Sequence, residues 1–238
     1  TPLTIKRKGS AYHSTKLKQL ASGSAIRKKI RANYKSNQPL LNNQLSTVLP
    51  ESTNQILKEE FNNNLGPVFY ENFSTSLLTL LRRIDKSELK NYEGITGGLE
   101  NRIKDAAQEA TSLAELIKLI KTKRFTQTRI QRILAQILLK IKVNQLKEFD
   151  KAGGPQYLRI LGFDKQCRQL LKKINKQAEL PVITKLANHF NSKYKPQTML
   201  QKMISYDIKA NNIYNLAYLN PQAKKGNIDF YKSPILNF

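Results

Sequence analysis

The sequence predicts a mainly α-helical protein with a few short strands. Apolar residues recur at steps of three and four over long stretches, most clearly from Thr128 to Val143, and this period is typical of one buried helix face. Residues that begin helices precede several of these stretches, as Ser112 does with Glu115 three positions later. Strand-like runs are few and short, and Tyr157 to Phe163 is an example.

The first part of the chain predicts one strand and three helices. A strand-like run from Leu3 to Lys6 leads through a polar loop to a helix that begins within Leu20 to Arg27. Residues 33–47 are rich in Asn and Ser and are expected to form a loop. Pro50 opens a second helix, and a third is expected from about Val68 to Ile84.

The middle of the chain predicts three further helices. Gly97 and Gly98 precede a helix expected near Leu99 to Ala110, and a capping box then begins a short helix from Leu113 to Ile120. The third helix is expected from Thr128 to Val143. It has an apolar stripe on one face and basic residues nearer the other.

The last part of the chain changes in character after Gly153-Gly154-Pro155. Tyr157 to Phe163 is expected to be extended, and a basic helix follows to about Lys176. A last long helix is expected from Gln197 to Leu219. Residues 221–238 contain two prolines and a glycine and are expected to be irregular.

The charge of the chain points to a polyanionic partner. Lys and Arg number 41 against 17 Asp and Glu, so the 238 residues carry a formal net charge of +24. A charge of this size repels itself in a compact fold, and a polyanion offsets that repulsion. Nucleic acid is therefore the leading partner class. An anionic membrane surface and a merely solvated basic surface are the alternatives.

Several other classes of protein fit the sequence poorly. The longest apolar run, Ile133 to Ile141, contains polar interruptions and is shorter than the ~20 residues of a membrane span. Cys167 is the only cysteine, which excludes an internal disulfide and fits a reducing cytoplasm. His13 and His189 are the only histidines and have no triad-like partners, so we assign no zinc site and no catalytic residue.

The stretch Ser22-Gly23-Ser24-Ala25-Ile26-Arg27 has the residues of an anion site. Backbone amides at a helix start, two hydroxyls and a cation one turn later can converge on one phosphate. The alternative is an ordinary capped helix with Arg27 in solvent. Spacing alone leaves both interpretations open.

Cations, hydroxyls and an aromatic side chain are interleaved from Lys118 to Arg132. This combination is typical of an RNA contact, because cations attract phosphates and Phe125 could stack on a base. The alternative is that Phe125 lies in the core and the charges form a solvated face. The candidate RNA-binding cations of this stretch are Lys121, Lys123, Arg124, Arg129 and Arg132.

A glycine turn around Gly97-Gly98 enters a helix whose first turns present polar side chains. Asn101, Arg102 and Lys104 on this helix join the candidate RNA-binding set. The turn could also position a phosphate or another segment of protein. Its spacing lacks the glycine pattern of known nucleotide loops, which makes it a weak phosphate cradle.

Five stretches together resemble the bacterial tRNA(Met) cytidine acetate ligases, and they occur in the order of that family over most of the chain. They are Thr4 to Gly9 with Tyr12-His13, Ser22 to Arg27, Glu93-Gly94 with Leu99 to Ile103, Ile120 to Arg132, and Tyr157 to Phe163. The shared order is more specific than any one stretch.

The resemblance implies an enzyme that activates acetate with ATP as acetyl-adenylate. It would then transfer the acetyl group to the exocyclic amine of the wobble cytidine in elongator tRNA(Met). The intact enzyme would use ATP, with Mg²⁺, in the cytoplasm and without a membrane. These expectations come from the family and not from spacing.

The resemblance also implies a domain order, because an α/β nucleotidyltransferase-like domain comes first in that family and a helical region follows. We therefore expect a mainly α, multi-helix domain with a few short strands, preceded by a remnant of the α/β nucleotidyltransferase-like domain. The remnant would be residues 1–35, and the helical domain with its basic RNA-facing surface residues 36–150. Residues 151–238 would form a C-terminal α/β-to-helical elaboration.

Site residues follow from the same resemblance. Arg7 and Lys8 would contact ATP near the end of the catalytic domain. Ser22, Ser24 and Arg27 match the second phosphate-binding motif of the family, although threonine is usual where Ser24 stands. That change keeps the hydroxyl. The cations of the Lys118 to Arg132 stretch would lie on the tRNA-facing side.

One feature of the family has no counterpart in this sequence. The HxGH segment that holds the triphosphate is missing, since no two histidines lie three residues apart, and the chain starts at Thr1. We therefore expect a fragment or a processed product that lacks adenylation activity by itself and holds no nucleotide tightly. The alternative function is a non-catalytic basic RNA-binding or ribosome-associated module. A peripheral membrane module is disfavoured because the basic residues are scattered over several elements.

Overall fold

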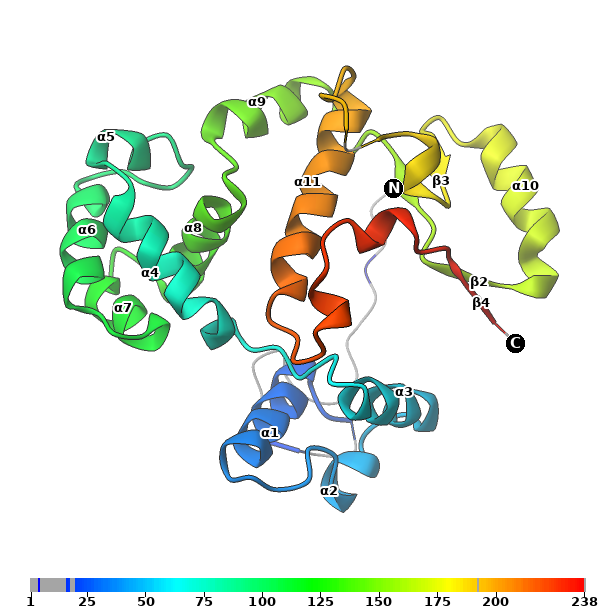
Figure 1. The fold of residues 1–238 in the computed structure, drawn as a ribbon, viewed down its shortest axis with the longest axis horizontal. Helices are drawn as coiled ribbons and strands as arrows, with labels where there is room; N and C mark the ends of the chain where they lie inside the picture. Colours follow the sequence, from blue (N-terminus) through cyan, green and yellow to red (C-terminus); the bar gives the residue numbers. More distant parts are fainter. Residues whose placement is uncertain (1–3, 5–15, 18–19, 192, 238) are drawn as a thin grey trace. The chain divides into compact units, whose positions relative to one another are not determined.

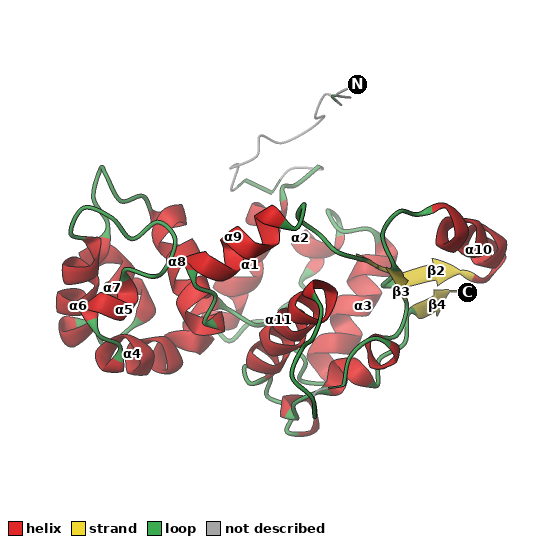
Figure 2. Ribbon diagram, turned by 90° about the horizontal axis from the view of Figure 1, so that it is seen from above, coloured by secondary structure: helices red, strands yellow, loops and turns green. Residues whose placement is uncertain are grey.

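The computed structural model describes residue 4, residues 16–17, 20–191 and 193–237. Helices predominate in this part of the chain, with four short strands (Figure 2). None of the described helices is both long enough and apolar enough to span a bilayer. The predicted run from Leu3 to Lys6 falls almost wholly outside the described residues, and Arg7, Lys8 and His13 lie outside them.

The chain divides into two compact units. The first unit contains residues 1–69 and 218–220, and the second contains residues 70–217 and 221–238. The predicted divisions at residues 35 and 150 concern the domains of the family and stay predictions.

The described residues of the first unit form three helices. They are α1 (Gly23–Lys35), α2 (Asn43–Ser46) and α3 (Glu51–Asn62). Helix α1 begins where the sequence predicts, because Ser22 caps it by accepting a hydrogen bond from the amide of Ala25 at 3.1 Å. The loop that follows is held by buried Asn33, whose Nδ2 donates to the carbonyls of Pro39 and Leu40 at 3.1 and 3.2 Å. The predicted loop of residues 33–47 therefore includes the short helix α2.

The second unit begins with a helical part that contains its main core (Figure 1, cyan to green). Its helices are α4 (Ser74–Arg83), α5 (Lys86–Leu89), α6 (Leu99–Glu109), α7 (Leu113–Ile120), α8 (Gln127–Leu139) and α9 (Val143–Lys151), after the 3-10 turn η1 (Tyr70–Phe73). Leu81, Leu116 and Ile120 are fully buried in the cluster between these helices. Burial of each such side chain stabilises the fold by about 1.5–3 kcal/mol.

Helix α8 ends earlier than its apolar pattern predicts. The expected helix ran from Thr128 to Val143, but Lys140 adopts a left-handed conformation with a φ of 54° and ends α8 after Leu139. A new helix, α9, then begins at Val143. The apolar pattern of the sequence therefore continues past the residue at which the backbone conformation ends the helix.

The C-terminal part of the second unit combines short strands with two longer helices. Its elements are β1 (Leu158–Arg159), β2 (Gly162–Asp164), η2 (Lys165–Cys167), α10 (Arg168–Gln177), β3 (Val182–Ile183), η3 (Leu186–Asn188), α11 (Met199–Asn215), η4 (Gln222–Lys224), η5 (Ile228–Phe230) and β4 (Ile235–Asn237). Strand β1 pairs in parallel with β3, and β2 pairs in parallel with β4. The segment predicted to be irregular therefore ends in a strand. Gly162 permits this pairing, because a Cβ there would lie 3.1 Å from the carbonyl oxygen of Ile235.

Candidate functional site

The start of helix α1 brings the predicted phosphate-binding residues together. The Arg27 side chain folds back along the helix, and its Nη2 donates to Ser24 Oγ at 3.4 Å. Its Nη1 would lie 3.2 Å from a Cβ on Gly23, so a residue without a side chain leaves room for the guanidinium there. Ser22 is 2% exposed, and its hydroxyl caps the helix.

This arrangement suits an anion on electrostatic grounds. The helix start carries partial positive charge from its amides, and the first turn of α1 contains no acidic residue. Arg27 adds a full charge at the same point. The Ser22 hydroxyl caps the helix, as the alternative interpretation expected. Ser24 is partly exposed and Arg27 is exposed, so a ligand could reach both. The role of these residues toward ATP stays a prediction.

Two of the predicted RNA-binding cations donate hydrogen bonds to backbone carbonyls at the C-terminal ends of neighbouring helices. Arg102 donates from Nε and Nη2 to the carbonyls of Ile120 and Leu119, at 2.8 and 2.6 Å, where α7 ends. The Lys104 ammonium donates to three carbonyls at the end of α4, at 2.7 to 3.0 Å. The last carbonyls of a helix lack intrahelical partners and carry partial negative charge, so cations stabilise them.

Arg129 has a similar structural role, and so does a residue that sequence reasoning missed. The Arg129 guanidinium donates twice to the carbonyl of Gly94, at 2.6 and 3.1 Å, and once to Thr96 Oγ1 at 3.0 Å. Arg82 donates to the carbonyl of Ala107, in the last turn of α6, and to that of Ala110, just after the helix, at 2.8 and 3.0 Å. No local pattern marks such cations, because their acceptors lie in distant parts of the sequence.

Phe125 lies in the core, as the alternative interpretation of its stretch expected. It is 7% exposed and belongs to the main hydrophobic cluster, so its ring faces are not open to a base. The guanidinium carbons of Arg124 and Arg129 lie 5.5 and 5.2 Å from the centre of its ring. Arg124 also covers Gly97, where an added Cβ would come within 2.3 Å of its guanidinium.

The remaining members of the predicted RNA-binding set face solvent. They are Asn101, Lys121, Lys123, Arg124 and Arg132. Asn101 lines a cleft of about 540 Å³ at the start of α6, where Asp105 and Glu109 also line the wall. Arg102 also lines the cleft, but the two carboxylates outnumber its charge and so disfavour phosphate there. The glycine turn is therefore a poor phosphate cradle in space as well as in sequence, and the candidate RNA contacts are the exposed cations around it.

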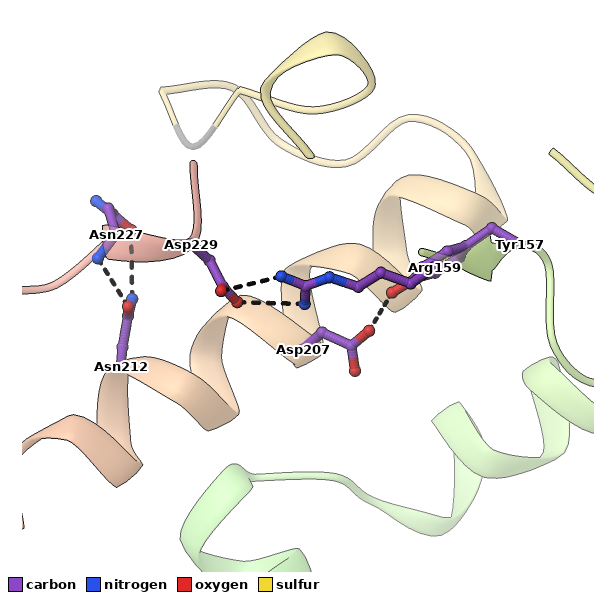
Figure 3. A network of polar contacts seen from close by, with 6 residues as sticks. All are labelled: Tyr157, Arg159, Asp207, Asn212, Asn227 and Asp229. Atoms are coloured by element: carbon purple, nitrogen blue, oxygen red, sulfur yellow. Dashed lines mark hydrogen bonds and ion pairs between the residues drawn. The ribbon is translucent and has the colours of Figure 1, made fainter. Parts of the chain in front are cut away.

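A polar network in the C-terminal part escaped sequence reasoning (Figure 3). Arg159 forms a two-pronged ion pair with Asp229 at 3.0 and 3.4 Å, and the Asp229 side chain is 4% exposed. The Tyr157 hydroxyl donates to Asp207 on helix α11. Burial, and then this hydrogen bond, raise the pKa of Tyr157. The Asn212 amide binds Asn227 through two hydrogen bonds, of 2.7 and 3.3 Å.

The described residues contain no group of three or more His, Cys, Asp or Glu side chains that could hold a metal ion. A comparison with known protein families adds a different kind of observation. The family model described as HIGH Nucleotidyl Transferase matches residues 1–229. The chain belongs to the HIGH nucleotidyl transferase family.

Several similar proteins carry the same name. The chain is 39% identical to the tRNA(Met) cytidine acetate ligase of Halothermothrix orenii, over 99% of this chain and 54% of that protein. It is 41% identical to the protein of the same name from Thermoanaerobacter sp., over 92% of this chain and 51% of that protein. The chain thus spans about half the length of the curated relatives it matches.

Solved structures with the same fold are also known. Thermotoga maritima TmcAL in an apo form matches with a TM-score of 0.84 and 28% identity, over 98% of this chain and 54% of that protein. A second structure of TmcAL, bound with alpha-thio ATP, matches with a TM-score of 0.80 over 92% of this chain. The bound nucleotide belongs to that protein.

These comparisons correct the predicted fold class. The nucleotidyl transferase similarity runs from residue 1 to residue 229, so the chain is not a separate helical domain after a short α/β remnant. Buried Asn33 binds the loop that follows α1, and α1, α2 and α3 belong to one compact unit.

Proposed function

We propose that this chain is the part of an ATP-dependent tRNA acetate ligase that binds tRNA and contributes to the ATP site. The names of the relatives and the nucleotide in one form of TmcAL support this proposal. The observation in this chain that carries it is the convergence of Ser24 and Arg27 at the start of α1. The reaction would take place in the cytoplasm, where tRNA and ATP meet.

The reaction has two steps, and the chain would assist the first with charge. A carboxylate oxygen of acetate attacks the α-phosphorus of ATP, the bond to the bridging oxygen breaks, and pyrophosphate leaves. Arg27 and the amides of α1 would stabilise negative charge on the phosphates as it develops. Ser24 would hold the guanidinium in place through its hydroxyl.

The second step requires the tRNA to be held against the adenylate. The exocyclic amine of the wobble cytidine attacks the acetyl carbonyl, a carbon–nitrogen bond forms, AMP leaves and the amine loses a proton. The exposed cations Lys121, Lys123, Arg124 and Arg132 would bind phosphates of the tRNA backbone. Each phosphate neutralised releases counterion, so we expect the affinity for elongator tRNA(Met) to fall steeply with salt.

Substitution of Arg27 tests the ATP site in the full-length gene product. Arg27→Ala should lower ATP-dependent incorporation of labelled acetate into tRNA(Met) by about 10²-fold, the typical cost of losing one charge-stabilising donor. Lys28→Ala is the matched control, because Lys28 is an exposed cation of the same helix and should leave incorporation unchanged. Equal loss in both variants would show that only the charge of α1 matters and would contradict the assigned site.

The same preparation tests the alternative function. If the full-length product binds tRNA with steep salt dependence yet neither binds ATP nor acetylates tRNA, a non-catalytic basic RNA-binding or ribosome-associated module is the correct description. If it acetylates tRNA and Arg27→Ala abolishes the activity, the acetate ligase is the correct description. The two results do not overlap.

A further inference from the structure

A second cleft, in the C-terminal part, has a lining suited to a flat organic ring. Its volume is about 510 Å³, which is within the usual range for ligand sites. Helix α9, residues 154–159 and helix α11 form its walls. Its principal lining residues are Phe149, Pro155, Tyr157, Met203, Tyr206 and Asp207. Aromatic and other apolar groups therefore make up most of the wall.

Tyr206 is placed as a rigid stacking surface in this cleft. Its ring meets Phe149 edge-on, with centroids 5.8 Å apart and an angle of 83° between the planes. This contact fixes the orientation of the ring while the side chain stays half-buried. An aromatic ring that is held in place and partly open is the kind of surface on which nucleobases stack.

The polar groups of the cleft disfavour phosphate and suit the edge of a base. Arg159 is the one cation among the lining residues, all of which are described, and it is paired with Asp229. Asp207 is exposed and carries a carboxylate, of which one oxygen accepts the Tyr157 hydroxyl. A carboxylate repels phosphate but accepts hydrogen bonds from amino and imino groups of bases.

A cation lies over the ring of Tyr206. The Lys209 ammonium lies 4.5 Å from the centre of the Tyr206 ring. Burial, and then repulsion by the charge of Lys140, lower the pKa of Lys209. A polyanion placed there would relieve that repulsion. The cleft is thus mostly apolar inside, with a cation over one of its rings.

We propose that this cleft binds one unpaired nucleobase of an RNA, with the ring against Tyr206 and the adjoining phosphates near Lys140 and Lys209. The proposal rests on the proposed function only in taking RNA as the partner. It adds a contact to a base, whereas the exposed cations of the helical part can contact phosphates of any sequence. The loop or tail of a tRNA contains such unpaired bases.

A single tryptophan reports directly on this cleft. The chain contains no Trp, so Tyr206→Trp introduces the only indole, at the position of the proposed stack. Single-stranded RNA oligonucleotides should quench its emission as they bind. Heparin, a polyanion without bases, should bind the basic surface without that quenching. RNA binding, seen by anisotropy of a labelled oligonucleotide, with unchanged emission would overturn the proposal, and so would equal quenching by heparin.

Affinity measurements at several salt concentrations give an independent test. Tyr206→Ala should weaken tRNA binding by about 10-fold, within the range found for loss of one stacked base, whereas Tyr206→Phe should keep the affinity. The slope of log affinity against log salt should not change in Tyr206→Ala, because that slope counts phosphates. Lys123→Ala should lower the slope by about 0.7 to 0.9.

The outcomes separate this proposal from the proposed function. If the unchanged chain binds no RNA, both fail. If it binds tRNA and Tyr206→Ala binds equally tightly, only the base-binding cleft is wrong. A thermal melt of each variant by circular dichroism identifies loss of folding, and the tryptophan measurement does not depend on removing the ring.

Discussion

The helical part of the second unit and its C-terminal part are stabilised in different ways. Among the described residues, twenty buried side chains form one cluster from Leu77 to Ile137, whereas the C-terminal part has a cluster of five. In the helical part, Arg102, Lys104 and Arg129 bind backbone carbonyls. In the C-terminal part, Arg159 instead joins a buried carboxylate 70 residues away.

This difference shows what determines whether a cation of this basic protein binds backbone carbonyls or a carboxylate. Where apolar burial already holds the helices, a cation near a helix end satisfies carbonyls that would otherwise lack partners. Where few apolar side chains are buried, a specific ion pair joins segments that are distant in sequence. Both kinds of cation already have partners within the protein, so net charge alone does not count the cations that could contact RNA.

The largest expected effect tests the size of the helical core. Leu116→Ala, at a fully buried position, should lower the free energy of unfolding by about 2–5 kcal/mol because it removes packed atoms and leaves a cavity. Urea denaturation measures it. Leu161→Ala is the control, because Leu161 is 71% exposed and surface changes stay within about 0.5 kcal/mol. An equal loss of unfolding free energy in the two variants would contradict the assignment of Leu116 to the buried core.

The next effect tests the ion pair of the C-terminal part. Arg159→Ala should cost roughly 2 to 3 kcal/mol, because it leaves the Asp229 carboxylate buried without its partner. The value is below that for a fully buried pair, since the Arg159 side chain is 28% exposed. Hydrogen exchange of the β1 and β3 amides measures the local loss.

Two further variants sharpen that result. Lys202→Ala breaks a pair with Glu148 in which both side chains are more than 40% exposed, and it should cost less than about 1 kcal/mol. Asp229→Asn added to Arg159→Ala should recover part of the loss, because the unpaired charge is gone. No recovery would mean that packing, and not charge, makes Arg159 important.

A smaller effect separates the two kinds of cation within the helical part. Arg102→Ala should lower stability by about 1–2 kcal/mol, because two carbonyls lose a charged donor, and it should change tRNA affinity less than Lys123→Ala does. Lys123→Ala should show the opposite pattern, with stability within about 0.5 kcal/mol. Paired denaturation and tRNA titrations measure both quantities. A larger loss of affinity in Arg102→Ala would return Arg102 to the RNA-binding set.

A further effect concerns alkaline pH. Burial raises the pKa of Tyr70 to about 12, whereas an unfolded chain has a tyrosine pKa of about 10. The folded state therefore favours the protonated phenol, and this stabilisation is present below about pH 10 and is lost as pH rises toward about 12. Tyr70→Phe should lose less stability over that interval than the unchanged chain.

Tyr231→Phe is the control for this measurement, because Tyr231 is 87% exposed. It should follow the pH dependence of the unchanged chain in urea titrations at each pH. If the two variants behave alike, burial of Tyr70 does not contribute to alkaline unfolding. Its hydrogen bond to the Gln131 carbonyl, at 3.1 Å, would then matter only at neutral pH.

Local sequence determined where several helices begin. Ser22, Ser112 and Thr126 each accept a hydrogen bond from an amide three residues later, at 3.1 to 3.4 Å. The reciprocal half of the predicted capping box at Ser112 does not form, because Glu115 accepts from Thr111 instead. Caps and apolar periods involve residues within one or two turns, and a sequence displays such neighbours directly.

Only the tertiary structure decided what the functional candidates contact. Lys104 and Lys123 are the same residue type, yet one holds the end of α4 and the other faces solvent. The pairing of β2 with β4 and the ion pair of Arg159 with Asp229 likewise join segments about 70 residues apart. The partners of these side chains depend on where the chain returns in space. That path follows from packing of the whole core, which no local pattern encodes.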